Sequence, residues 1–307
     1  MNDPRAAAVG IDVGGTTIKM GLVSIDGRVL DRRRIAYSSL PDFEALTTAL
    51  IVEAQAMARA IQCKISCVGL ATPGHAQRQD GLMVDGTANV PVLRNRSLAA
   101  ALRDRIGVQV STVNDGTAAT LGELHYGAGR NLKRFVVVTL GTGVGGGVAI
   151  DGRVVTGDDG EPPELGAMVL DATAQYPRTL EDFAGAAGFA RAYRQRGGSD
   201  RLTPEEIFTC AASGNDAALR AIEDTALRIA QGLGTLVNTL NLNACLLAGG
   251  MAQAGAALLD PVRNSMRDFT WPYLLSRASV RLAETGNDAG ILGAAEIAFR
   301  SAGKNVS

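Results

Sequence analysis

The stretch Asp12-Val13-Gly14-Gly15-Thr16-Thr17-Ile18-Lys19 joins two apolar runs, 8–12 and 18–25, through a pair of glycines. The runs predict two strands, and Asp26-Gly27 predicts a turn into a third strand over 28–35. We therefore expect an antiparallel meander. Paired glycines let backbone N–H groups approach phosphate oxygens, and an acidic residue at a strand end can hold the water shell of Mg²⁺. A plain hairpin turn accounts for the same residues about equally well.

A second glycine hairpin is predicted between the apolar runs 135–140 and 146–150. It lacks the Lys-Ser/Thr end of a P-loop and the following helix of a dinucleotide fingerprint. Its glycines exceed what a turn needs, which favours a phosphate-binding loop over a plain turn. A third pair, Gly249-Gly250, follows a strand over 244–247 and precedes a predicted helix, where an adenine ring could lie against backbone.

The rest of the chain alternates between helical and strand patterns. The expected elements are a helix beginning at Pro41, a strand over 65–70, a helix over 98–106, a strand over 108–113, a helix from Asn114-Asp115 to Leu124, a long helix over 216–240 and a closing helix over 288–299. Thr179 with Asp182, and Thr203 with Glu206, predict capping boxes. The chain is therefore expected to be an α/β protein of two similar halves, each opening on a glycine hairpin.

Composition limits the partners. A chain of 307 residues exceeds one typical core, which favours two lobes. Its net charge of -1, without a basic tail, argues against nucleic acid and membrane partners and favours a small molecule. The first nine residues are too short and polar for a signal peptide, and no apolar run approaches a membrane span, so we expect a cytoplasmic protein.

The four cysteines are scattered, at positions 63, 67, 210 and 245, and we expect buried thiols rather than disulfides. Cys63 and Cys67 have the spacing of half a metal site. No second pair of ligands completes it.

Taken together, these motifs resemble those of the ROK sugar kinases, named for repressors, open reading frames and kinases, within the actin and hexokinase superfamily. The resemblance runs from Gly10 to about Phe299. It implies a two-lobed actin-like ATPase (ribonuclease H-like) fold with duplicated topology. The small lobe would span 1–115, with a C-terminal helix of about 291–307 packed back on it, and the large lobe would span 116–290.

The resemblance implies ATP and Mg²⁺ as cofactors. The first phosphate loop would comprise Asp12, Gly14, Gly15, Thr16, Thr17 and Lys19, the second Gly141, Thr142, Gly143 and Gly145, and the adenosine motif Gly249 and Gly250. Asp12 would hold Mg²⁺ through water.

The sugar residues implied by the resemblance are Gly74, Asn89, Asn114, Asp115, Glu164 and Glu181. Asp115 would be the catalytic base of an ATP-dependent phosphotransferase acting on a primary hydroxyl, such as C6 of a hexose, an amino sugar or a related compound. A homodimer is expected, as is common in the family. Glu164 and Glu181 also fit plain surface charges at helix ends.

Two departures from the family pattern concern zinc. Ala167 stands where the family commonly has a histidine that contacts sugar and binds zinc, and 171–179 lacks the usual cysteines. All four zinc ligands of the family are therefore missing, and we expect no zinc site and no histidine contact to the sugar.

Two other classes remain open: a sugar-binding regulator of the same family without kinase activity, and a pseudoenzyme acting through partners. Eleven residues precede Asp12 in this sequence, too few for a helix-turn-helix, which favours the enzyme. The complete set of phosphate loops argues against the pseudoenzyme. The identity of the sugar stays open.

Overall fold

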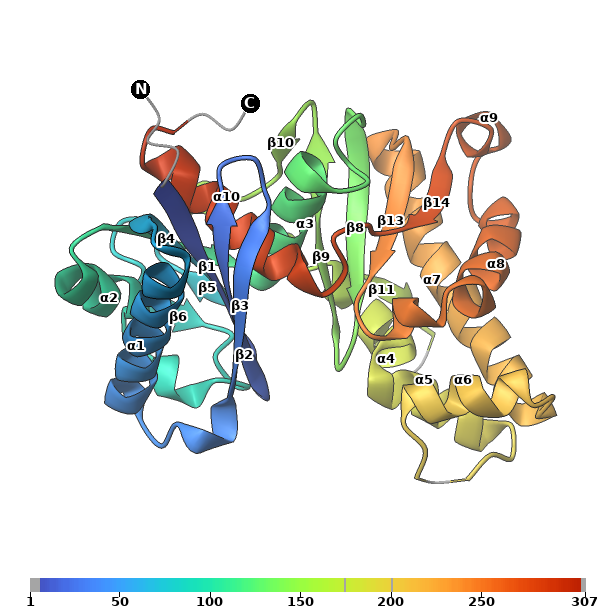
Figure 1. The fold of residues 1–307 in the computed structure, drawn as a ribbon. Coiled ribbons are helices and arrows are strands. Elements are labelled where there is room, and N and C mark those ends of the chain that lie inside the picture. The colour runs from blue at the N-terminus through green and yellow to red at the C-terminus, as the bar shows by residue number, and fades with distance from the viewer. Residues whose placement is uncertain (1–5, 174, 200, 305–307) are drawn as a thin grey trace. The chain divides into compact units, whose positions relative to one another are not determined.

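The computed structural model describes residues 6–173, 175–199 and 201–304 (Figure 1). These residues divide into two compact units, each built on a five-stranded sheet. Unit 1 comprises 6–130, 154–163 and 287–304, and unit 2 comprises the described residues of 131–153 and 164–286. Unit 1 therefore includes the helix that follows Asn114, whereas the sequence-based boundary between the lobes falls after Asp115.

The sheet of unit 1 has the strand order β3-β2-β1-β4-β7. The first three strands form the expected antiparallel meander, and β4 and β7 extend it in parallel. The elements of unit 1 are β1 (Ala6–Val13), β2 (Thr17–Ser24), β3 (Val29–Ala36), α1 (Phe43–Ile61), β4 (Lys64–Thr72), β5 (His75–Ala76), β6 (Met83–Asp85), α2 (Leu98–Ile106), β7 (Gln109–Asn114), α3 (Asp115–Tyr126) and α10 (Ala289–Ser301).

The two faces of this sheet are covered by different helices. Val9 and Ile11 of β1 belong to a core shared with α1 and α2, whereas Ala8 belongs to one shared with α10. This alternation follows from the two-residue period of a strand. On the face of the sheet that it covers, α10 contacts β1, β4 and β7, and it also contacts α3 (Figure 1).

Backbone-to-backbone contact fixes α10 in place. A Cβ on Gly69 of β4 would lie 1.7 Å from the Ala294 carbonyl oxygen, and a Cβ on Gly293 would lie 1.7 Å from that of Ala118. Only glycine allows either approach, since heavy atoms repel strongly at such distances. The helix backbone therefore lies directly on the sheet and on α3.

A buried polar cluster joins α3 to α10. Glu296 is 1% exposed and accepts hydrogen bonds from the Tyr126 hydroxyl at 2.7 Å and from Arg300 Nε at 2.6 Å. Burial raises the pKa of Tyr126, and the neighbouring Glu296 carboxylate raises it further. Burial also lowers the pKa of His125, whose Nε2 lies within hydrogen-bond distance of an Arg300 donor. A neutral imidazole fits this position.

The sheet of unit 2 repeats the plan, with the order β10-β9-β8-β13-β14. A β-hairpin again precedes two strands added in parallel. The elements that form and cover it are β8 (Arg134–Leu140), β9 (Val144–Ile150), β10 (Arg153–Val154), β11 (Val169–Asp171), β12 (Arg178–Thr179), α4 (Leu180–Ala184), α5 (Ala186–Gln195), α6 (Pro204–Ala212), α7 (Asp216–Leu240), β13 (Ala244–Ala248), α8 (Ala256–Ser265), α9 (Pro272–Leu275) and β14 (Ser279–Leu282). The two similar halves expected from the sequence are thus confirmed.

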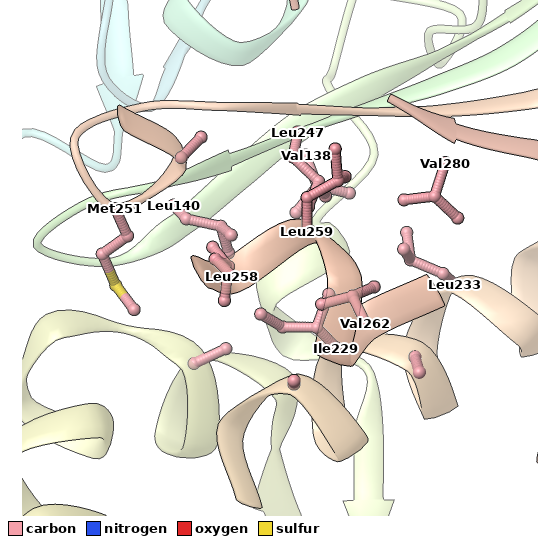
Figure 2. Close-up of a cluster of buried hydrophobic side chains, with 14 of the residues drawn as sticks. Val138, Leu140, Ile229, Leu233, Leu247, Met251, Leu258, Leu259, Val262 and Val280 are labelled. Atoms are coloured by element: carbon pink, nitrogen blue, oxygen red, sulfur yellow. The ribbon is translucent and has the colours of Figure 1, made fainter. Parts of the chain in front are cut away.

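Figure 2 shows part of the core of unit 2, where strand residues such as Val138 and Leu247 meet Ile229 of α7 and Leu258 of α8. Both helices present apolar residues at helical spacing. The 25 residues of α7 match the predicted helix and end at Leu240, and the cap residue Asn241 that follows adopts a left-handed conformation. Among the described helices, none combines the length and low polarity needed to cross a membrane.

Several helices begin where a side chain caps their first turn. Both predicted capping boxes are present, at Thr179 and Thr203. α1 begins at Phe43 rather than Pro41, because the Asp42 side chain accepts a hydrogen bond from the Ala45 N–H. After Gly249-Gly250 the chain forms a 3₁₀ turn, Met251–Ala254, so α8 begins later than the sequence pattern suggests.

The contact between Gly293 and Ala118 generates a stability prediction. Alanine forms helix better than glycine by ~1 kcal/mol, yet Gly293→Ala should lower the free energy of unfolding by ~1–3 kcal/mol, because the added methyl group meets the Ala118 carbonyl. Urea unfolding followed by circular dichroism measures the change. Ser301→Ala, at an exposed position of the same helix, is the control and should stay within ~0.5 kcal/mol of wild type. A Gly293→Ala protein as stable as this control would contradict the packing.

Candidate active site

The predicted residues of unit 1 gather at one edge of its sheet. β1, β4 and β7 run parallel and in step, with Asp12 opposite Ala71 and Thr72 opposite Asn114. The carboxyl ends of parallel strands meet at the same edge, where open α/β sheets typically bind ligands. The loop after each strand therefore begins beside its neighbours.

The first glycine loop touches the segment that carries Asn89. A Cβ on Gly15 would lie 2.6 Å from the Asn89 carbonyl oxygen, so a side chain at this position would displace one of the two. Gly15, Thr16 and Asn89 are all exposed. A predicted phosphate loop and a predicted sugar residue are thus in contact within unit 1.

Asp12 carries an ion pair and a neighbour that the sequence analysis missed. Its Oδ2 lies 3.3 Å from Lys19 Nζ, across the β1–β2 pair. A Cβ on Gly290, near the start of α10, would lie 2.8 Å from the Asp12 carboxyl carbon. The closing helix therefore begins against the candidate Mg²⁺ residue, a contact that no sequence spacing indicates.

Both polar atoms of the Asn114 side chain, Oδ1 and Nδ2, form hydrogen bonds. Its Oδ1 caps α3 by accepting from the N–H groups of Gly116 at 2.9 Å and Thr117 at 3.2 Å, and its Nδ2 donates to the Gly74 carbonyl at 3.0 Å. The side chain thus fixes the start of α3 and the position of Gly74. One amide hydrogen remains for a ligand.

Asp115 is the first residue of α3 and its side chain is exposed. One carboxylate oxygen accepts from the Gly116 N–H at 2.8 Å. An exposed carboxylate held at a helix start, beside the loops that follow β1 and β4, has the accessibility that a general base requires.

In unit 2, the second glycine loop lies against the third glycine pair. β8 and β13 are parallel, with Thr139 opposite Ala248, so both segments start at one edge. Gly249 has a φ of +88°, and a Cβ there would lie 2.4 Å from the Leu140 carbonyl oxygen. Thr142, Gly249 and Gly250 are exposed. The two segments predicted to bind nucleotide are therefore neighbours.

Glu181 contacts the second glycine loop. Its Oε2 accepts a hydrogen bond from the Val144 N–H at 2.9 Å, and a Cβ on Gly143 would lie 2.4 Å from the same oxygen. The capping box of Thr179 fixes the start of α4 and so the direction of Glu181. The sequence analysis predicted a sugar residue here and did not foresee its link to the loop.

Glu164 precedes a short 3₁₀ turn, Leu165–Ala167, and both Glu164 and Ala167 are exposed. Neighbouring side chains are committed elsewhere. The Met168 side chain packs on the core of unit 2 and against Gly232, and the Arg178 guanidinium stacks on Phe183 at 4.0 Å. Neither stands in for a histidine at position 167.

The segment expected to lack zinc is held by other contacts. β11 and β12 pair antiparallel, Gln231 Nε2 donates to the Leu170 carbonyl at 2.9 Å, and the Met168 carbonyl accepts from the Leu180 N–H at 2.8 Å. Within residues 6–173, 175–199 and 201–304, no group of three or more His, Cys, Asp or Glu is placed to hold a metal.

The cysteines are free thiols, and two of them, Cys67 and Cys245, are buried. Burial raises the pKa of Cys245 to about 12 and also raises that of Cys67. Both therefore behave as small core residues.

Comparison with known proteins places these features in context. Residues 8–301 match the model of the ROK family. The chain is 30% identical to a glucokinase of Thermotoga maritima, over 96% of this chain and 98% of that protein. It is 29% identical to an N-acetylmannosamine kinase of Citrobacter koseri, over 95% and 98%.

Among solved structures, a ROK family glucokinase from Streptomyces griseus in complex with glucose and AMPPNP superposes with a TM-score of 0.82, at 26% identity, covering 96% of this chain and 99% of that one. This likeness and the two repeated sheets confirm the expected two-lobed actin-like ATPase fold with duplicated topology.

The zinc prediction concerns purified protein. Elemental analysis should find well below one zinc per chain, and treatment with a chelator should leave the thermal midpoint unchanged, because hydrogen bonds hold β11 and β12. Gln231→Ala removes the hydrogen bond to the Leu170 carbonyl and should lower the free energy of unfolding by ~1 kcal/mol, with or without chelator. One zinc per chain, or a midpoint lowered by chelation, would show that a metal contributes.

Proposed function

The chain belongs to the ROK family, and from that membership we propose that it transfers the γ-phosphoryl group of ATP to a primary hydroxyl of a sugar. The observation that carries the proposal is Asp115, an exposed carboxylate at the edge where β1, β4 and β7 end. A base in this position can accept a proton beside a phosphate-binding loop.

For the nucleotide, we assign the N–H groups of both glycine loops to the phosphates. Gly14, Gly15, Thr16 and Thr17, with Lys19, serve in unit 1, and Gly141, Thr142, Gly143 and Gly145 serve in unit 2. Gly249-Gly250 receives the adenosine, supported by its contact with Leu140 at the end of β8. Exposed loop amides can stabilise phosphate charge.

For the sugar, we assign Gly74, Asn89 and Asn114 of unit 1 and Glu164 and Glu181 of unit 2. Support comes from the chain of contacts at the edge of unit 1. Gly15 touches Asn89, and Asn114 donates to Gly74. On this assignment Asn114 acts mainly by orienting Gly74 and α3.

The reaction then needs little covalent chemistry from the protein. Asp115 accepts the proton of the sugar hydroxyl. The hydroxyl oxygen bonds to the γ-phosphorus, and the bond between the γ-phosphorus and the oxygen that leaves with ADP breaks. Asp12 fits Mg²⁺ held through water, since its carboxylate is partly exposed and Lys19 engages one oxygen. Bound Mg²⁺ would neutralise phosphate charge.

A sugar-binding regulator without kinase activity is the alternative. ADP release measured with a panel of hexoses, amino sugars, N-acetyl amino sugars and cyclitols separates the two. Sugar-dependent ADP release supports the kinase, and sugar binding without ADP release supports the regulator. We further propose a cytoplasmic homodimer, by analogy with the family, and light scattering of the purified protein tests the dimer.

The base assignment predicts the effect of Asp115→Asn. The amide keeps the shape of the side chain and cannot take up a proton, so kcat should fall by at least ~10²-fold while sugar affinity changes little. Steady-state kinetics and sugar binding by calorimetry measure the two quantities.

The matched control is Asp104→Asn, the same change at an exposed position of α2 in unit 1. It should leave kcat within about twofold of wild type. Near-normal turnover by Asp115→Asn would place the base elsewhere.

A specificity prediction follows from Ala167. By resemblance, the missing histidine meets the C1–C2 end of the sugar, and neither Met168 nor Arg178 is free to replace it. A lost hydrogen bond costs ~0.5–1.5 kcal/mol and an unpaired buried hydroxyl ~1–3, so glucose should lose a few-fold to roughly a hundredfold in kcat/KM. At least one analogue altered at C1, C2 or C3 should exceed glucose in kcat/KM.

Ala167→His is the companion variant and should raise kcat/KM for glucose relative to the analogues. If glucose has a higher kcat/KM than every analogue with the wild-type protein, other groups make up for the missing histidine contact, and the enzyme is a glucokinase without that histidine.

A further inference from the structure

A basic cavity lies in unit 2, outside the residues assigned above. It has a volume of about 230 Å³, below the ~300–1,000 Å³ of sites for drug-sized ligands. It lies where α4, α5 and α7 pack together (Figure 1). Its walls include three arginines, Arg178, Arg191 and Arg228, together with Phe183 and Thr225. The size suits a small ligand, and the arginines suit an anion.

The arginines keep most of their donors for a ligand. Each guanidinium has five N–H groups. Arg228 donates to the Gln231 side chain at 3.0 Å, and Arg191 donates to the Asp182 carbonyl. Arg178 makes no hydrogen bond with the described residues; its guanidinium stacks on Phe183 and is attracted by the charges of Asp171 and Asp182.

The nearby carboxylates hydrogen-bond to other groups. Asp171 accepts from the Thr173 N–H and hydroxyl, and it attracts Arg178 and Arg228 only through space. Both oxygens of Asp224 accept from Arg196, at 2.7 and 2.8 Å. Asp182 accepts from the Thr179 backbone at 2.8 Å within its capping box. The positive charge of the cavity is therefore not cancelled by direct hydrogen bonds from these acids to its arginines.

Two cations share one aromatic ring. The guanidinium carbons of Arg178 and Arg228 lie 4.0 and 4.5 Å from the centroid of Phe183. The ring attracts each cation, but the two like charges repel one another. The attraction of both cations to an anion bound beside them would offset this repulsion.

A buried hydroxyl at the cavity also lacks a partner. Thr225 is 2% exposed, and its Oγ1 makes no hydrogen bond with the described part of the chain. A buried donor without an acceptor is unfavourable, and an oxygen of a bound anion would satisfy it.

We propose that this cavity binds a phosphate group, as free phosphate or as part of a small phosphate monoester. Arginine matches the geometry of phosphate oxygens, and several arginines match its double charge. A wider hollow of about 430 Å³ shares Arg178, Arg191 and Gln195 with the cavity and adds Tyr176, Pro177 and Asp182. It offers room for the organic part of a monoester. The proposal does not depend on the phosphoryl transfer proposed above.

Calorimetry or ³¹P NMR of the full chain tests the proposal. Inorganic phosphate is titrated with a non-hydrolysable ATP analogue and Mg²⁺ already bound, so that the glycine loops are occupied. Wild type should bind one phosphate per chain. R178Q/R228Q should weaken binding by roughly tenfold or more for each guanidinium. Arg220→Gln, the same change at an exposed position of α7, should leave it within about twofold.

Thr225→Val provides a second variant that keeps the shape of the side chain. Losing an unpartnered hydroxyl should not lower the thermal midpoint without ligand, whereas phosphate affinity should fall roughly two- to tenfold. A second titration uses hexose 6-phosphate. Hexose 6-phosphate binding that is tighter than that of inorganic phosphate and is weakened in R178Q/R228Q identifies a monoester as the ligand of the cavity, and equal binding identifies free phosphate. No saturable binding, or equal binding by R178Q/R228Q and wild type, overturns the proposal.

Discussion

Parallel pairing of the central strands is the constraint on which the candidate residues of each unit depend. Within unit 1, β1, β4 and β7 end at one edge of their sheet, and within unit 2, β8 and β13 end at one edge of theirs, because parallel strands point the same way. Loops that are distant in sequence therefore begin side by side. Each unit thus presents exposed residues of its glycine segments at one edge of its sheet, and in unit 1 the exposed Asp115 lies at the same edge.

Packing behind the sheet of unit 1 supports this edge. α10 lies on β4 and α3 through glycine contacts, and it carries Glu296 into a buried cluster with Tyr126 of α3. The helix that begins with Asp115 is therefore anchored at its far end by a charged, hydrogen-bonded group. Breaking one partner of such a cluster leaves a buried charge uncompensated, which is costly. The helix that carries the candidate base is consequently packed against the helix that stabilises unit 1.

In unit 2 a short helix has two roles. α4 directs Glu181 onto the second glycine loop and Phe183 into the basic cavity. Its five residues are held by a capping box at Thr179. The same short helix therefore positions one side chain at the loop and another at the cavity.

The sequence by itself determined the glycine hairpins, the alternation of strands and helices, the capping boxes and the resemblance that marks Asp115, because periodicity and turn chemistry are local properties. It gave no sign of β14, a four-residue edge strand with one buried residue. Only the tertiary structure decided that Asn114 holds Gly74, that Glu181 binds the Val144 N–H and that Arg178 and Arg228 meet on Phe183. Each of these contacts joins residues from separate elements. Their distance in space depends on how helices pack on the sheet, which spacing along the chain does not encode.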